Sequence, residues 1–144
     1  MRVIVQRVLE ASVKVNEKIV GQIGKGYLLY IGIHTEDTTE EVQKMAEKIH
    51  NLRIFEDEQG KMNLNLAAVT GSILAISQFT LYGNTKGNNR PSFIEAARPF
   101  TAEPLYELLC QLLSKDHPVE KGVFGEHMMI HAINDGPVTI LIEI

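Results

Sequence analysis

The 144-residue chain is 44% hydrophobic, which suits one globular domain over residues 1–144 and leaves too little length for two domains of ordinary size. Its formal net charge of −4 provides no general positive field, so indiscriminate binding to nucleic acid is disfavoured. The longest apolar run, Tyr27 to Ile33, is far shorter than the roughly 18 residues of a membrane span, and Met1 to Arg7 lacks the apolar core of a signal peptide, so we expect a cytoplasmic protein without a membrane partner.

The N-terminal third has the pattern of β-structure. Val3-Ile4-Val5 and Val13-Lys14-Val15 are typical of strands. Ile19 to Ile23 follows the turn residues Asn16-Glu17-Lys18 at a spacing that predicts a hairpin. Tyr27 to Ile33 is apolar throughout, which predicts a strand buried on both faces.

The spacing of hydrophobic residues then changes from strand to helix. Between Thr38 and Leu52 they form one stripe at helical spacing, and Thr38 and Glu41 are placed as a capping box. The sequence therefore predicts a helix over 38–52. Arg53 to Phe55 resumes an extended pattern, and Asp57 to Gly60 is a turn.

A buried strand and a second helix follow. Ile73 to Ile76 is a short apolar run of the buried-strand type. A helix is predicted to begin near Thr101, where leucines recur at helical spacing and Pro104 would stand in the first turn. The single Cys110 falls among these leucines, so we expect a buried thiol in a reducing compartment rather than a catalytic nucleophile.

The C-terminal region predicts two more strands, Met128 to Ile133 and Val138 to Ile144. The overall pattern is that of an α+β fold, mostly antiparallel or mixed sheet, with two main helices. Gly136-Pro137 separates the last two strands. Because a cis X-Pro bond costs only about 0.5 to 1 kcal/mol over trans, a fold can hold this bond cis, and a simple turn explains the pair equally well.

The segment Ser77-Gln78-Phe79-Thr80 places two hydroxyls and an amide at the end of a predicted strand. Ser77 and Thr80 are candidate nucleophiles, but an alcohol needs a base, and no His, Asp, Glu or Lys is near either in sequence. If the strand continues through Thr80, the two hydroxyls lie on opposite faces. The alternative is structural, with both hydroxyls satisfying nearby backbone groups.

Two histidines, His127 and His131, have a spacing that would make them metal ligands on a helix. The segment has a strand pattern, which would place them about 13 Å apart, too far to share one ion. Surface or partly buried histidines are the better interpretation. We expect no metal and no cofactor.

The segment Gly83 to Pro91 is rich in Gly and Asn and predicts a polar loop without regular structure. Lys86 and Arg90 are the only charged residues between Ser77 and Ile94. Such a loop can contact a nucleotide backbone, and an ordinary solvated loop is the alternative.

These segments together resemble the D-aminoacyl-tRNA deacylase family, also called D-tyrosyl-tRNA deacylases. Two strings carry most of the resemblance, Ser77-Gln78-Phe79-Thr80-Leu81 and Asn134-Asp135-Gly136-Pro137-Val138-Thr139. The likeness extends over almost the whole chain through the segments Met1 to Val8, Ala11 to Val13, Lys48 to Asp57, Gly60 to Asn63, Arg90 to Phe93 and Gly122 to Gly125.

The resemblance implies a barrel-like fold and a homodimer that hydrolyses the ester of D-aminoacyl-tRNA, or of mischarged glycyl-tRNA, as chiral proofreading in translation. The catalytic residues that would line the ester are Ser77, Gln78, Phe79 and Thr80. Gly136 and Pro137 would form a cis pair that one subunit inserts into the pocket of the other to exclude the side chain of an L-amino acid.

Two mechanisms have been argued for this family, one with the threonine as nucleophile and one with the 2′-hydroxyl of tRNA assisting while backbone amides hold the oxyanion. The lack of a base near Thr80 favours the second.

A function of another class is a non-catalytic nucleic-acid-binding module that has kept the fold. The acidic net charge and the retention of both motifs weigh against it. His127 stands where most members of the family have an acidic residue, and the loop from Gly83 to Asn89 is less basic than theirs, so tRNA contacts are expected to differ.

Overall fold

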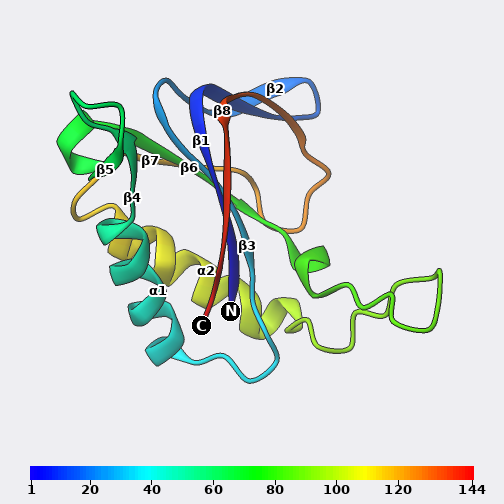
Figure 1. The fold of residues 1–144 in the computed structure, drawn as a ribbon. Coiled ribbons are helices and arrows are strands. Elements are labelled where there is room, and N and C mark those ends of the chain that lie inside the picture. Colours follow the sequence, from blue (N-terminus) through cyan, green and yellow to red (C-terminus); the bar gives the residue numbers. More distant parts are fainter.

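The fold is a mixed β-sheet curled into a nearly closed barrel, with two helices packed on one side (Figure 1). The computed structural model describes residues 1–144. The strands are β1 (Arg2–Val15), β2 (Lys18–Ile23), β3 (Gly26–Gly32), β4 (Arg53–Glu56), β5 (Met62–Asn65), β6 (Ser72–Ser77), β7 (Val119–Lys121) and β8 (Met129–Glu143). The helices are α1 (Thr39–Asn51) and α2 (Pro99–Leu113), and the short 3-10 turns are η1 (Ala67–Val69) and η2 (Phe79–Tyr82).

Strand β1 organises the sheet. One edge pairs with β3 over its first half and with β2 over its second half, and the other edge pairs with β8 along its length, all antiparallel. Strands β3, β6 and β7 continue the sheet as parallel neighbours. The predicted α+β class, with a mixed sheet, a barrel-like shape and two main helices, is confirmed.

The predicted hairpin joins β1 to β2 through Asn16 and Glu17. Both residues have positive φ angles, 49° and 66°, as the two central residues of a tight hairpin turn require. The predicted buried strand is also confirmed, since β3 is buried along almost its whole length.

Parallel strands need long crossover connections, and α1 and α2 lie in the two connections of this sheet. Both helices pack on the same face of the barrel (Figure 1). The core between them and the sheet contains fully buried side chains such as Tyr27, Leu29, Met45, Ile49 and Leu109. Neither helix is long and apolar enough to cross a membrane.

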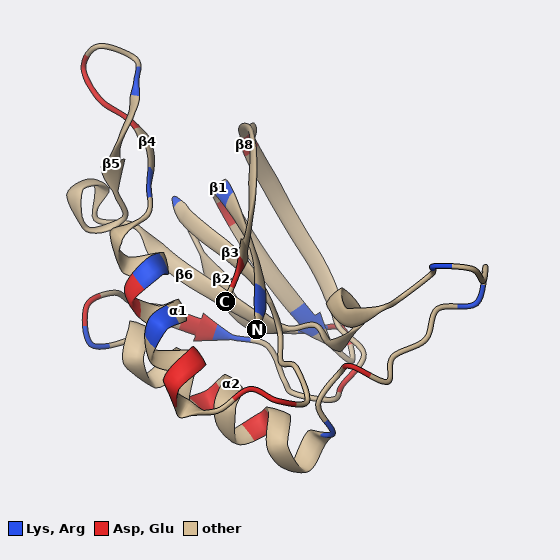
Figure 2. Ribbon diagram, turned by 60° about the horizontal axis from the view of Figure 1, so that its bottom comes forward, with Lys and Arg blue, Asp and Glu red and all other residues tan.

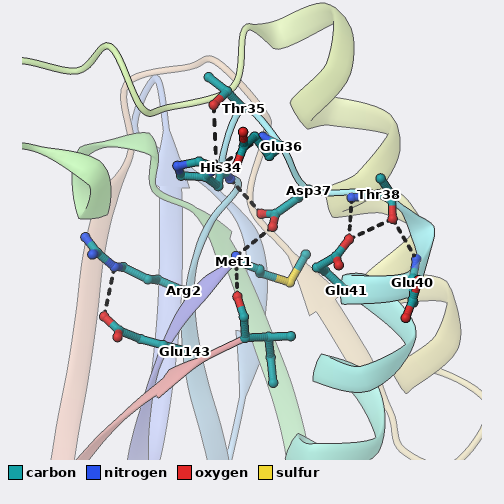
Figure 3. Close-up of polar contacts among 11 residues, drawn as sticks. Met1, Arg2, His34, Thr35, Glu36, Asp37, Thr38, Glu40, Glu41 and Glu143 are labelled. Atoms are coloured by element: carbon teal, nitrogen blue, oxygen red, sulfur yellow. Dashed lines mark hydrogen bonds and ion pairs between the residues drawn. The ribbon is translucent and has the colours of Figure 1, made fainter.

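The start of α1 lies beside both chain ends. The predicted capping box is confirmed, because Thr38 and Glu41 bond each other's backbone and side chain. Next to it, the N-terminal ammonium of Met1 donates to Asp37 Oδ1 over 2.7 Å, and Asp37 Oδ2 accepts the His34 N–H (Figure 3). The same ammonium donates to the Ile144 carbonyl over 3.1 Å, so this buried cluster joins β1, the end of the chain and the loop before α1.

Helix α2 begins at Pro99, two residues before Thr101, which confirms the predicted helix but places Pro104 beyond the first turn, so that part of the prediction is wrong. Pro99 can open the helix because the first helical N–H needs no intrahelical acceptor. Pro104 lies inside the helix and cannot donate to the Phe100 carbonyl. Pro104 and Phe100 are both exposed, so water can donate to the Phe100 carbonyl in place of the missing N–H.

The prediction of two C-terminal strands is also wrong. β8 is one strand from Met129 to Glu143, and it remains paired with β1 on both sides of Gly136-Pro137. The register shifts between Gln6 and Val8 and again between Val8 and Glu10, so the chain bulges there instead of turning. The short strands β5 and β7 were not predicted, because three or four residues carry too little pattern.

Candidate active site

A cavity of about 840 Å³ opens at the C-terminal end of β6. Of its 21 lining residues, 13 are hydrophobic, which is typical of a site for a small organic group held by a few polar contacts. The lining comes from the end of β3, the end of β6, the first half of α2 with the segment before it, and the segment that leads into β8. At its inner wall, Tyr106 donates from its hydroxyl to the Ala75 carbonyl over 2.9 Å, and burial raises the pKa of Tyr106, so this tyrosine stays neutral.

Ser77, Gln78 and Phe79 lie on the cavity wall, as predicted for residues that would line a substrate. β6 ends at Ser77, where its parallel pairing with β3 stops, and the Gln78 N–H donates to the Ile31 carbonyl over 2.7 Å. The chain then turns into η2. The strand therefore does not continue through Thr80, and the alternation that would place the two hydroxyls on opposite faces does not apply.

Thr80 follows one residue later in η2, is exposed, and does not line the cavity. Its hydroxyl receives a hydrogen bond from the Gln78 side-chain amide. No imidazole, carboxylate or lysine amine bonds to this hydroxyl, so no group is placed to take its proton. The first hydrogen bond of the turn runs from Leu81 N–H to the Gln78 carbonyl, so the Phe79 and Thr80 amides have no acceptor within the turn.

Phe79 and Phe93 form an aromatic edge of the cavity. Their ring centroids are 5.2 Å apart at an interplanar angle of 70°, an edge-to-face arrangement. Phe79 remains 58% exposed, so part of its ring is in contact with solvent.

Besides Tyr106, three charged or titratable side chains line the cavity, Arg98, Glu126 and His127. Arg98 precedes α2, and the other two precede β8. Sequence reasoning missed Arg98 and Glu126 as site residues, because they come from separate segments of the chain that only the tertiary fold brings to one cavity. No local pattern in the sequence marks them.

His127 and His131 do not form a metal site. His131 is an exposed residue of β8, and its Nε2 lies 3.7 Å from a Glu10 carboxylate oxygen. No group of three or more His, Cys, Asp or Glu side chains is placed to hold a metal ion. Cys110 is buried as predicted, and burial raises the pKa of its thiol to about 11, which keeps it protonated and a poor nucleophile.

Gly136 and Pro137 lie in the β8 bulge, joined by a cis peptide bond, and both are exposed. Neither lines the cavity of its own chain, so one chain does not bring the two motifs together. Gly136 has a φ of +125°, and a Cβ there would lie 2.9 Å from Val138 Cγ2 and 3.1 Å from Arg7 Nη2. A side chain at position 136 is therefore both strained and crowded.

The Arg7 side chain stabilises the β8 bulge through contacts with Asp135. Its guanidinium is almost fully buried, donates from Nε to the Asp135 carbonyl over 3.2 Å, and donates from Nη1 to the Ile54 carbonyl over 2.8 Å. The Asp135 carboxylate lies 3.3 Å from the same Nε. Arg7 was missed as a functional residue, although a signal exists, because it follows the buried positions Val3 and Val5 at strand spacing and so points inward.

Comparison with known proteins agrees with this architecture. The family model described as D-Tyr-tRNA(Tyr) deacylase matches residues 4–143. A protein named D-aminoacyl-tRNA deacylase from Brevibacillus brevis is 54% identical over 144 residues, which cover 99% of each chain. One of the same name from Thermotoga petrophila is 51% identical, covering 99% of this chain and 97% of its own.

Two solved structures share the fold. One, named "c-Myc DNA Unwinding Element Binding Protein", superposes with a TM-score of 0.94 at 40% identity and covers 99% of this chain and 98% of its own. The other, described as a probable eukaryotic D-amino acid tRNA deacylase, has a TM-score of 0.83 at 20% identity, with the same coverage, and supports the fold alone. The family model and the full-length relatives place the chain in the D-Tyr-tRNA(Tyr) deacylase family.

Proposed function

We propose that this protein hydrolyses the ester bond of D-aminoacyl-tRNA and releases the free D-amino acid and tRNA. Relatives of this name are more than half identical over the full chain. The observation that carries the proposal is the apolar cavity with Ser77, Gln78 and Phe79 on one wall, which suits an aminoacyl ester on a terminal nucleoside.

In the proposed mechanism, the 2′-hydroxyl of the terminal adenosine assists the hydrolysis, and the backbone amides of Phe79 and Thr80, which have no acceptor within the turn, stabilise the oxyanion. Support comes from the Thr80 hydroxyl, which has no base beside it. Preorganised N–H donors typically contribute several kcal/mol at a developing oxyanion, about 2.7 to 4 kcal/mol for one donor, so backbone can supply much of the catalysis.

Chiral selectivity would come from Gly136 and Pro137 of a second copy of the chain. A preference of about 10⁴ for the D-isomer over the L-isomer requires a difference of about 5.5 kcal/mol in transition-state free energy, since each tenfold in rate corresponds to about 1.36 kcal/mol. One ordinary hydrogen bond contributes only about 0.5 to 1.5 kcal/mol, whereas a wall of fixed backbone can exclude a misplaced side chain outright. Glycine has no side chain to exclude, so glycyl-tRNA would also be a substrate.

The position of the pair supports a homodimer. Gly136 and Pro137 are exposed in the β8 bulge and absent from the cavity of their own chain, so a role at the substrate would require a second copy of the chain. The same region carries several exposed hydrophobic side chains of β1 and β8, namely Leu9, Met129, Ile133 and Leu141. Such side chains are typical of a surface that another chain covers.

A second candidate function is nucleic-acid binding without catalysis. It is suggested by the solved structure that is 40% identical, because that protein is named for binding a DNA element. The acidic net charge and the intact cavity favour the enzyme.

Incubation with D-tyrosyl-tRNA, L-tyrosyl-tRNA and glycyl-tRNA separates the two candidates. We expect release of D-tyrosine and glycine and retention of L-tyrosine on tRNA. A binding module would release none of the three amino acids, and release of L-tyrosine at the D rate would contradict the proposed wall.

A further inference from the structure

We infer that the loop from Asn84 to Ser92, here called the cationic loop, binds backbone phosphates of tRNA upstream of its terminal nucleotide. This inference rests on the proposed function, because it assumes that the aminoacyl ester occupies the cavity. It assigns a role to a segment that takes no part in the chemistry.

The base of the cationic loop lies next to the cavity. Asn84 and Ser92 exchange both backbone hydrogen bonds, over 2.8 and 2.9 Å, and so close the loop at its base. The next residues, Phe93 and Ile94, line the cavity, and Phe93 packs against Phe79. A ligand that fills the cavity through its mouth therefore passes beside the base of this loop.

The loop extends away from the body of the protein in both ribbon views (Figures 1 and 2). Its turn is ordered by local bonds, because Lys86 N–H donates to Asn84 Oδ1 over 2.8 Å and Asn88 N–H donates to the Thr85 carbonyl over 3.2 Å. Seven residues lie between Asn84 and Ser92, and about three on each arm allow a reach of roughly 10 Å beyond the closure. The ester lies on the last nucleotide of tRNA, so the preceding phosphates must leave the cavity on its open side.

The charges of this segment are unusual for the chain. Lys86 and Arg90 are the only charged residues between Ser77 and Ile94. In Figure 2 the outer part of the loop carries blue segments and no red ones. The other 12 of the 14 Lys and Arg residues share the rest of the chain with all 18 Asp and Glu residues, so the rest carries a net charge of −6. A polyanion is therefore repelled by most of the surface and attracted here.

Neither cation of the loop is used within the protein. The Lys86 ammonium and the Arg90 guanidinium take part in none of the ion pairs or hydrogen bonds, whereas Arg2, Arg7 and Lys121 are all paired with carboxylates. Unpaired cations on an ordered, exposed loop are free to contact phosphates, which fix the position of a nucleic acid without reading its sequence.

The test uses two substrates and the double variant Lys86→Ala/Arg90→Ala. On D-tyrosyl-tRNA we expect KM to rise roughly tenfold at low salt. The slope of log KM against log salt should become shallower by about 1.4, because each phosphate contact to a single strand contributes about 0.7. On the 3′-O-D-tyrosyl ester of adenosine, which has no phosphate, kcat/KM should stay at the wild-type value.

A matched control is Arg53→Ala/Lys61→Ala, which removes one arginine and one lysine that are also exposed and unpaired. Both lie in the β4–β5 hairpin, at the opposite end of the molecule from the cationic loop (Figure 2). This control should leave KM and the salt slope for D-tyrosyl-tRNA unchanged.

The inference is overturned if the loop variant keeps the wild-type KM and salt slope on D-tyrosyl-tRNA, or if it loses activity equally on both substrates. If the wild-type protein hydrolyses neither substrate, the proposed function fails first. That result is distinguishable from a failure of the loop alone, in which both substrates are hydrolysed and the variant matches the wild type.

Discussion

Replacing Arg7 by methionine should weaken both the fold and chiral selectivity, because this one side chain connects the β8 bulge to β4. The change removes two charge-assisted hydrogen bonds, to the Asp135 and Ile54 carbonyls. At about 1.5 to 3 kcal/mol each, these bonds are together worth about 3 to 6 kcal/mol. The Asp135 side chain is 38% exposed and its carboxylate can be hydrated, so we expect a loss of about 3 kcal/mol, near the lower limit.

A loss of this size leaves most domains folded, since typical stabilities are about 5 to 15 kcal/mol. The variant can therefore be assayed. Without Arg7 the segment Asp135 to Pro137 loses its support, and a relaxation worth about 1.4 kcal/mol would lower the D over L preference tenfold. Urea unfolding measures the first effect, and the ratio of kcat/KM on D- and L-tyrosyl-tRNA measures the second.

Lys121→Met is a suitable control for the loss of a charge. Lys121 pairs with Glu107 over 2.6 Å, but both side chains are more than 40% exposed, so the loss should stay within about 1 kcal/mol. If Arg7→Met is no less stable than this control, or keeps the wild-type D over L ratio, then the bulge is held by other contacts and the reasoning is wrong.

Three further substitutions test separate parts of the structure. Gly136→Ala should lower turnover of D-aminoacyl and glycyl substrates alike, because its Cβ would lie 2.9 Å from a Val138 methyl group at a φ of +125°; unchanged kinetics would contradict this crowding. Thr80→Ala should retain substantial kcat on D-tyrosyl-tRNA, and an acyl-enzyme trapped on Thr80 would refute the proposed mechanism. Asp37→Asn should lower the unfolding free energy by about 3 to 5 kcal/mol, because it leaves the buried N-terminal ammonium without its counter-ion; a urea midpoint equal to that of the wild type would show that the pair adds nothing.

The local sequence pattern was enough to predict several elements of the fold. The buried strand β3, the capping box at Thr38 and the hairpin at Asn16-Glu17 each depend on residues close in sequence. The continuity of β8 was missed because Gly-Pro is equally compatible with a turn and with a bulge. Only the long-range pairing with β1 decides between them.

The candidate site divides in the same way. Ser77, Gln78 and Phe79 were predicted because they form one segment with a recognisable sequence, and the structure places them on the cavity. Arg98 and Glu126 reach the cavity from the segments that precede α2 and β8, so their role depends on tertiary packing that no short pattern encodes. Arg7 is intermediate, because its inward position follows from strand alternation but its partners do not.

The three proposed tasks of the protein lie on different elements, which has a testable consequence for how variants combine. The ester is handled at the end of β6, chirality is checked by the β8 bulge above Arg7, and phosphates are bound by the cationic loop. None of the hydrogen bonds or ion pairs joins the bulge to the cationic loop, so their effects should be independent. Arg7→Met combined with Lys86→Ala/Arg90→Ala should therefore multiply the separate losses in kcat/KM on D-tyrosyl-tRNA, while the D over L ratio stays that of Arg7→Met alone. A further fall in that ratio would mean that tRNA docking itself positions the amino acid against the wall.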